Sequence, residues 1–168
     1  MKVKKLLALV LSALMAVTML TACGGGGGGG NSGGGGGVSV ISLDYGEINR
    51  ILKAEGYNKT VSASSNLLTG VKEAAAMLSE HNFNEVTSSD LSSSVATMAK
   101  SHVTTSGPVG FGKNRVEVLG GRYNEAVASI ASSYMSQGLD ATYTAAAVEF
   151  TSADGVKCYL YVVHAAYN

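Results

Sequence analysis

The sequence TYTAAAVEFT (residues 142–151), SADG (152–155) and VKCYLYVVHAAY (156–167) decides the fold. The two long runs are apolar and rich in residues that favour strands, and the polar segment between them is typical of a hairpin turn. In the second run, Leu160 and Val162 alternate with Tyr161 and Val163, so both faces of the strand are apolar. Because such a strand is buried on both sides, we expect the sheet to be covered on each face.

Four segments before this hairpin have the apolar spacing of amphipathic helices. The expected helices span residues 44–57, 65–80, 88–100 and 122–137. Asp44 is the expected cap of the first helix, and Ser65 or Asn66 that of the second. Residues 104–121 are expected as a loop that contains a short strand at 116–119. Helices followed by a hairpin predict an α+β fold, an α-β-α sandwich with helices packed on both faces of a small, mainly antiparallel sheet.

Residues 1–22 predict a signal peptide instead of a part of this fold. Three lysines within the first five residues precede an apolar run at residues 6–20. About 15 apolar residues are fewer than the roughly 20 that cross a membrane, which argues against the alternative of a transmembrane helix. The segment LTAC (residues 20–23) resembles the bacterial lipobox, which implies cleavage before Cys23 and lipidation of its thiol. Two or three acyl chains on Cys23 anchor a protein stably, whereas one chain does not.

Residues 23–37 are expected to form the lipidated Cys23 and a glycine-rich tether. Twelve of the 14 residues at 24–37 are glycine, and polyglycine stays a flexible coil because it buries no apolar surface. Its root-mean-square span is about 20 Å. A phosphate-binding glycine loop would need a strand before it and a helix after it, and neither is predicted. Residues 38–168 are then expected to form one domain.

Charge and cysteine content exclude some classes of function. The chain has 12 basic and 12 acidic residues; the signal peptide removes three lysines, which leaves nine against 12, or a net charge of −3. No nucleic-acid partner is expected, because such proteins usually carry a basic patch. Cys158 is the one cysteine that remains after lipidation of Cys23, so no internal disulfide is expected. Its apolar neighbours favour a buried core residue over a reactive thiol.

Five short segments of the domain carry a family resemblance. They are residues 48–50 with 54–56, 67–77 with Phe83, 110–114 (Gly-Phe-Gly-Lys-Asn), 126–127 with 136–139, and 159–163. In this order they resemble a bacterial CAP (SCP-like) domain, of the cysteine-rich secretory protein, antigen 5 and pathogenesis-related 1 family. The resemblance runs over residues 48–165 and also implies an α-β-α sandwich.

The chain departs from this family at the positions that matter for a metal. Many CAP domains hold two histidines and two glutamates in a cleft. Lys113 stands where the resemblance implies a glutamate, Leu139 where it implies a histidine, and Glu85 lies where the other histidine is expected. A lysine repels a metal ion and a leucine cannot bind one. We therefore expect no metal and no cofactor in the cleft that Glu85, Lys113 and Leu139 would line.

Glu149, His164 and His81 are the remaining candidates for acid–base chemistry. His164 alternates with Val162 on the last strand, and is interpreted either as a core histidine with one hydrogen bond or as the partner of Glu149. Glu149 could equally lie at a wet edge of the sheet, since a buried carboxylate is costly unless it is paired. His81 follows a helix and is interpreted either as a capping or solvated residue, or as a ligand paired with Glu80 or Glu85.

Two hypotheses for function follow from different classes of protein. The first is a membrane-anchored, extracytoplasmic lipoprotein whose non-catalytic CAP-like domain binds an envelope or extracellular protein, lipid or glycan. The second is a cell-envelope hydrolase with a rearranged acid–base site, which requires the candidate side chains to lie within reach of one another. The tether and the signal fit a Gram-positive cell surface.

Overall fold

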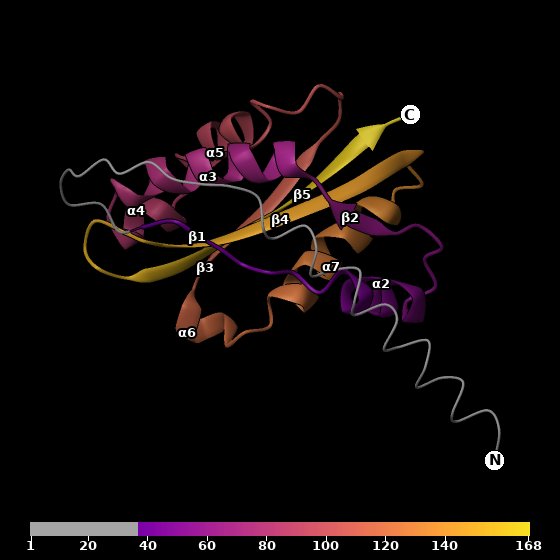
Figure 1. Ribbon diagram of the computed structural model, residues 1–168, viewed down its shortest axis with the longest axis horizontal. Helices are drawn as coiled ribbons and strands as arrows, with labels where there is room; N and C mark the ends of the chain where they lie inside the picture. The colour runs from indigo at the N-terminus through magenta and orange to yellow at the C-terminus, as the bar shows by residue number, and fades with distance from the viewer. Residues whose placement is uncertain (1–36) are drawn as a thin grey trace, which may run out of the picture. The chain divides into compact units, whose positions relative to one another are not determined.

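A computed structural model describes residues 37–168, and these residues belong to one compact unit (Figure 1). The predicted signal peptide, Cys23 and nearly all of the tether lie outside the described residues. The helices are α2 (Tyr45–Ala54), α3 (Ser65–Ser79), α4 (Phe83–Thr87), α5 (Ser92–Ala99), α6 (Val116–Leu119) and α7 (Tyr123–Met135). The strands are β1 (Ser39–Val40), β2 (Val61–Ala63), β3 (Val109–Arg115), β4 (Ala141–Thr151) and β5 (Lys157–Tyr167). Within residues 37–168, no helix is long and apolar enough to cross a membrane.

The sheet is built around the predicted hairpin, which is confirmed. β4 and β5 pair along their whole length, from Ala141 opposite Tyr167 to Thr151 opposite Lys157. The strand order is β1-β4-β5-β3, and β2 adds a short parallel pairing to β4. The two short strands thus share one edge of β4, and β3 lies at the opposite edge of the sheet.

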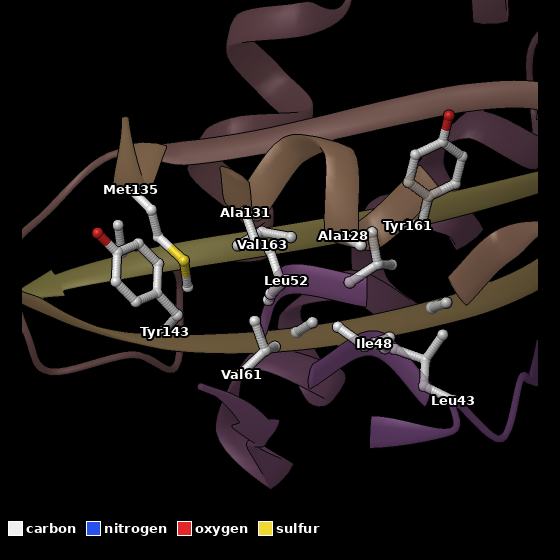
Figure 2. Packing of buried hydrophobic residues seen from close by; sticks show 14 of the residues in the cluster. Leu43, Ile48, Leu52, Val61, Ala128, Ala131, Met135, Tyr143, Tyr161 and Val163 are labelled. Atoms are coloured by element: carbon white, nitrogen blue, oxygen red, sulfur yellow. The ribbon is translucent and has the colours of Figure 1, made fainter. Parts of the chain in front are cut away.

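Each face of the hairpin packs against its own layer of helices, as its two apolar faces predict (Figure 1). Tyr161 and Val163 of β5 join the core formed with α2 and α7, which we call the α2–α7 face (Figure 2). Leu160 and Val162 join the core formed with α3, α4 and α5, the α3–α5 face. The expected α-β-α sandwich with a mainly antiparallel sheet is therefore confirmed.

One strand lies where a loop was expected. β3 occupies residues 109–115, whereas 116–119, expected as a strand, form the short helix α6. β3 lacks an alternating apolar pattern because Gly110 faces α7 and Gly112 faces Tyr161 of β5. A Cβ on Gly110 would lie 2.6 Å from Ile130 Cγ2, and one on Gly112 would collide with the ring of Tyr161. The neighbouring side chains thus fill the space above β3, so tertiary packing determines this strand.

The helix ends also differ from expectation in places. Asp44 caps α2 as predicted, because its side chain accepts a hydrogen bond from the Glu47 N–H at 2.9 Å. α3, however, is capped by Ser64, one residue before the expected position. The sequence analysis missed α4 altogether, although Asn82 and Glu85 form a reciprocal capping box there. α5 consequently begins at residue 92 and not at 88.

Candidate functional site

The structure separates Glu149 from His164. Glu149 lies opposite Tyr159 on β5, and His164 is five residues further along that strand, about 16 Å away. The Glu149 side chain lies on the α2–α7 face, whereas His164 shares the α3–α5 face with Val162. The expected acid–base couple is therefore not formed. Glu149 instead lies 3.8 Å from the Lys157 ammonium and is partly exposed. It is not at a sheet edge, because it pairs with Ser39 of β1 on one side and with Tyr159 of β5 on the other.

His164 is a core residue, as one interpretation predicted. Its side chain is 1% exposed, and its Nε2 atom has no hydrogen-bond partner among the described residues. Burial lowers the pKa of His164, and the nearby Lys100 charge lowers it further. The imidazole is therefore held in its neutral form inside the sandwich.

His81 lies at the other end of the hairpin and has a structural role. Its Nδ1 atom is 3.4 Å from Glu85 Oε2, so the expected pairing of these two residues is formed. The same Glu85 oxygen also accepts a hydrogen bond from the Asn82 N–H of the α4 capping box. The His81 carbonyl accepts a bond from the Ala153 N–H in the hairpin turn. This cluster joins the β4–β5 turn to the start of α4.

The positions that the family resemblance placed in one cleft do not converge. The ammonium of Lys113 donates to the Ser88 carbonyl at 3.0 Å, next to α4 and Glu85. Lys113 pairs with Leu160, whereas Leu139 lies just before the start of β4, which pairs with the far end of β5. Leu160 and Tyr167 are seven positions apart on β5, which corresponds to about 23 Å. Glu85 and Lys113 therefore share one region, and Leu139 belongs to another.

Two serine hydroxyls donate to a carboxylate, Ser101 to Glu73 at 3.1 Å and Ser152 to Asp154 at 2.6 Å. Cys158 is fully buried, and burial raises the pKa of its thiol to about 11, so a reactive thiolate is not formed at neutral pH. Among residues 37–168, no group of three or more histidine, cysteine, aspartate or glutamate side chains is placed to hold a metal ion. His102 forms only an exposed pair with Glu73, at 2.8 Å.

A pocket of about 310 Å³ lies at the end of the sheet where Leu139 is found. Two loops form it, one after α2 and one between α7 and β4. The lining residues are Tyr57, Asn58, Lys59, Met135, Gly138, Leu139 and Asp140. The pocket is near the lower end of the size range of small-molecule sites and combines apolar with polar walls, as such sites do.

Lys59 fixes the shape of this pocket. Its ammonium bonds Asp140 Oδ1 at 2.9 Å and the carbonyls of Leu139 and Ala141 at 3.2 and 3.3 Å. These bonds use all three donors of the lysine and join the two loops. Lys59 and then Asn168 lower the pKa of Asp140, so this carboxylate is charged at neutral pH. Lys59 is therefore a scaffold residue, and the ligand-facing groups must come from its neighbours.

The groups left for a ligand are an aromatic ring, an amide and a carboxylate oxygen. Both bonds to the Asp140 side chain go to Oδ1, so Oδ2 has no partner among the described residues. The exposed Asn58 side chain has none there either, and Tyr57 is partly exposed in the pocket wall. Together they present two hydrogen-bonding groups beside one flat apolar surface.

Tyr143 is buried behind the pocket residue Met135 and does not itself line the pocket. Its ring lies beside Met135, and its side chain is directed toward the same end of the core (Figure 2). The residue is 2% exposed, and its hydroxyl has no hydrogen-bond partner among the described residues. Burial raises the pKa of Tyr143, with opposing smaller effects of Lys59 and Asp140. The phenol therefore stays neutral.

No protein-family model, no curated protein and no solved structure matches this chain. The site is thus defined by its own geometry. Of the pocket residues, Leu139 is the one that the sequence analysis placed in a candidate site. The others have no local signature, because Tyr57, Asn58 and Asp140 come from loops 80 residues apart that meet only through the fold.

Proposed function

We propose that this chain is a lipid-anchored, extracytoplasmic binding protein whose domain recognises a glycan without altering it. The observation that carries the proposal is the pocket between the α2–β2 loop and the α7–β4 loop, with its free Asn58 amide and Asp140 oxygen beside Tyr57. Anchoring through Cys23 rests on the N-terminal sequence alone.

A glycan fits this pocket better than a lipid does. A sugar ring offers hydroxyls that donate to a carboxylate and accept from an amide, together with a C–H face that packs on an aromatic ring. The pocket supplies these three partners in Asp140, Asn58 and Tyr57. Its volume of about 310 Å³ and its charged rim leave little room for an acyl chain.

The separation of the candidate catalytic groups supports a non-catalytic role. Glu149 and His164 lie on opposite faces of the sheet, and His81 bonds with Glu85 near the hairpin turn. None of these three candidates lines the pocket. The hydrolase alternative requires an acid and a base within reach of one bound substrate, and these residues do not meet that requirement.

Membership in the CAP family is part of this proposal. The order of elements supports it, with helices first, the Gly-Phe-Gly segment on β3, then α7 and a terminal hairpin. The distance between Lys113 and Leu139 argues against a family-type cleft in this chain. A binding role at the pocket around Leu139 does not depend on such a cleft.

The test is calorimetric titration of the full chain, in non-ionic detergent, with neutral N-acetylhexosamine oligosaccharides and with a short-chain phospholipid. We expect binding of the oligosaccharide, weakened about fivefold by Asn58→Ala, as loss of one hydrogen bond of about 1 kcal/mol implies. Tyr57→Ala should weaken it as well. Asn84→Ala is the matched control, because Asn84 is an exposed asparagine on α4, outside the pocket lining.

Three results would contradict the proposal. Binding of the phospholipid but not of the oligosaccharide would assign the pocket to a lipid. An equal loss with Asn58→Ala and Asn84→Ala would place the glycan elsewhere. Release of shortened oligosaccharides during the titration would indicate a hydrolase.

A further inference from the structure

The outer edge of β3 is not part of the pocket and has no role in the function proposed above. β3 spans seven residues and pairs with β5 on one side, and it has no strand on its other side within residues 37–168. Residues 109–114 are all partly exposed. Edge strands of this length usually carry some protection against pairing with other chains.

The register shows which backbone groups point outward. The Ala165 N–H donates to the Pro108 carbonyl at 3.1 Å, which makes these two residues a hydrogen-bonded pair. Hydrogen-bonded and non-bonded pairs alternate along an antiparallel ladder. Gly110 and Gly112 therefore bond with β5, whereas Phe111 and Lys113 direct their N–H and C=O groups away from it. None of these outward groups has a hydrogen-bond partner among the described residues.

Three cations border this edge. The pKa of the nearby Asp154 carboxylate is lowered by a hydrogen bond from Ser152 and, to a smaller extent, by the charge of Arg115, one of the three. Lys100 lies at the start of β3, where its ammonium bonds the Gly107 carbonyl at 2.9 Å. Lys113 bonds the Ser88 carbonyl, and the Arg115 guanidinium lies 4.2 Å from the centre of the Phe83 ring. None of these three cations forms an ion pair within the described part of the chain.

We propose that the β3 edge binds an extended acidic peptide segment of a partner protein by strand addition. The partner's backbone would bond with the outward N–H and C=O groups of Phe111 and Lys113. Lys113 and Arg115 are two residues apart and so lie on one face, where they match carboxylates at alternate positions of the added strand. Phe111 continues that face and favours an apolar residue next to the two acids. This interaction is independent of the pocket.

The test uses the full chain in non-ionic detergent and a fluorescein-labelled peptide of alternating glutamate and threonine. Fluorescence anisotropy should show binding that weakens with salt, and none for the same peptide with lysine in place of glutamate. Lys113→Met should weaken binding by about threefold, as loss of one exposed ion pair implies. Lys113→Pro also removes the outward N–H, which an edge strand tolerates, and should abolish binding. Lys72→Met, at an exposed cation on α3, is the matched control.

Amide hydrogen exchange on the unaltered protein gives a second readout that does not depend on any variant folding. Exchange at Phe111 and Lys113 should slow when the peptide is added, while Gly110 and Gly112 are already protected. Failure of the acidic peptide to bind, or binding without this protection, would overturn the proposal. If the protein bound phosphatidylglycerol vesicles as tightly as the acidic peptide, and the amides of Phe111 and Lys113 were not protected, the interaction would be a non-specific attraction between cations and a negative surface. Protection that rises with protein concentration in the absence of peptide would assign the edge to a second copy of this chain.

Discussion

Two buried polar atoms, the Tyr143 hydroxyl oxygen and His164 Nε2, have no hydrogen-bond partner among the described residues. A buried hydroxyl without a partner costs free energy because it has lost its bonds with water. The sequence did not predict that either atom would be unpaired. A sequence pattern indicates which side chains are buried, but it does not indicate which hydrogen-bond partners lie next to them in the fold.

Tyr143→Phe should raise the free energy of unfolding by about 1 kcal/mol, because it removes an unpaired hydroxyl and keeps the ring. Urea denaturation measures this change. Tyr45→Phe is the matched control on the same α2–α7 face, because the Tyr45 hydroxyl donates to the Ala145 carbonyl at 2.8 Å. That variant should lose about 1 kcal/mol. A loss with Tyr143→Phe would mean that its hydroxyl has a partner in solution.

His164 should make stability depend on pH. Burial lowers its pKa in the folded state, whereas the unfolded histidine titrates near its ordinary value of about 6.5. The unfolded chain therefore binds a proton first, so stability is complete above about pH 6.5 and falls as the pH drops below it. The slope from one proton is at most about 1.4 kcal/mol per pH unit.

Urea denaturation between pH 5 and pH 7.5 tests this dependence. The slope should be largely lost in His164→Leu and kept in His81→Gln, whose side chain is partly exposed. Lys100, on the α3–α5 side, is the charge that adds to the effect of burial, so Lys100→Met should reduce the slope without removing it. An unchanged slope in His164→Leu would assign the dependence to another group.

At the scale of elements, Gly70 determines how closely α3 approaches α5. A Cβ at this position would lie 2.5 Å from the carbonyl oxygens of Met98 and Ala99. Alanine favours a helix over glycine by about 1 kcal/mol, yet here its methyl group would push two backbones apart. Gly70→Ala should therefore lower the free energy of unfolding by roughly 1–3 kcal/mol, the usual range for overpacking.

Thermal and urea denaturation of Gly70→Ala measure this loss. Thr69→Ala is the control on the same helix, because Thr69 is exposed and a change within about 0.5 kcal/mol is expected there. A more stable Gly70→Ala protein would show that α5 moves away at little cost, and that helix propensity outweighs the contact.

The elements that were predicted correctly are those whose own residues carry a regular apolar pattern. The hairpin has apolar residues on both faces, and α7 has a regular apolar stripe, so both were predicted closely. β3 was missed because Gly110 and Gly112 have no side chains, so β3 has no alternating apolar pattern of its own. Side chains of neighbouring elements fill the space above these glycines. α4 was missed because it has five residues and one buried side chain, although the Asn82–Glu85 spacing was a readable cap.

At the scale of the whole molecule, the anchor is the part that sequence alone supports. Cys23→Ala should abolish incorporation of radiolabelled palmitate, because it removes the thiol that carries the lipid. Metabolic labelling measures this effect. Palmitate labelling that persists in Cys23→Ala would contradict the lipobox interpretation. The pocket proposed as the binding site could not be predicted from the sequence, because its two loops meet only when β2 and β4 pair.

The small number of bonds that join β1 to the sheet would have a mechanical consequence in the proposed lipid-anchored protein. β1 joins the sheet through two register pairs with β4 and one further bond, from the Ile41 N–H to the Ala147 carbonyl. β4 and β5 share eleven such pairs. A pull on the tether reaches β1 before any other described strand, and peels its bonds away one after another. Residues 38–43 span about 20 Å when fully extended, and their release would also withdraw Leu43 and Ile41 from the α2–α7 core and Val38 from the other.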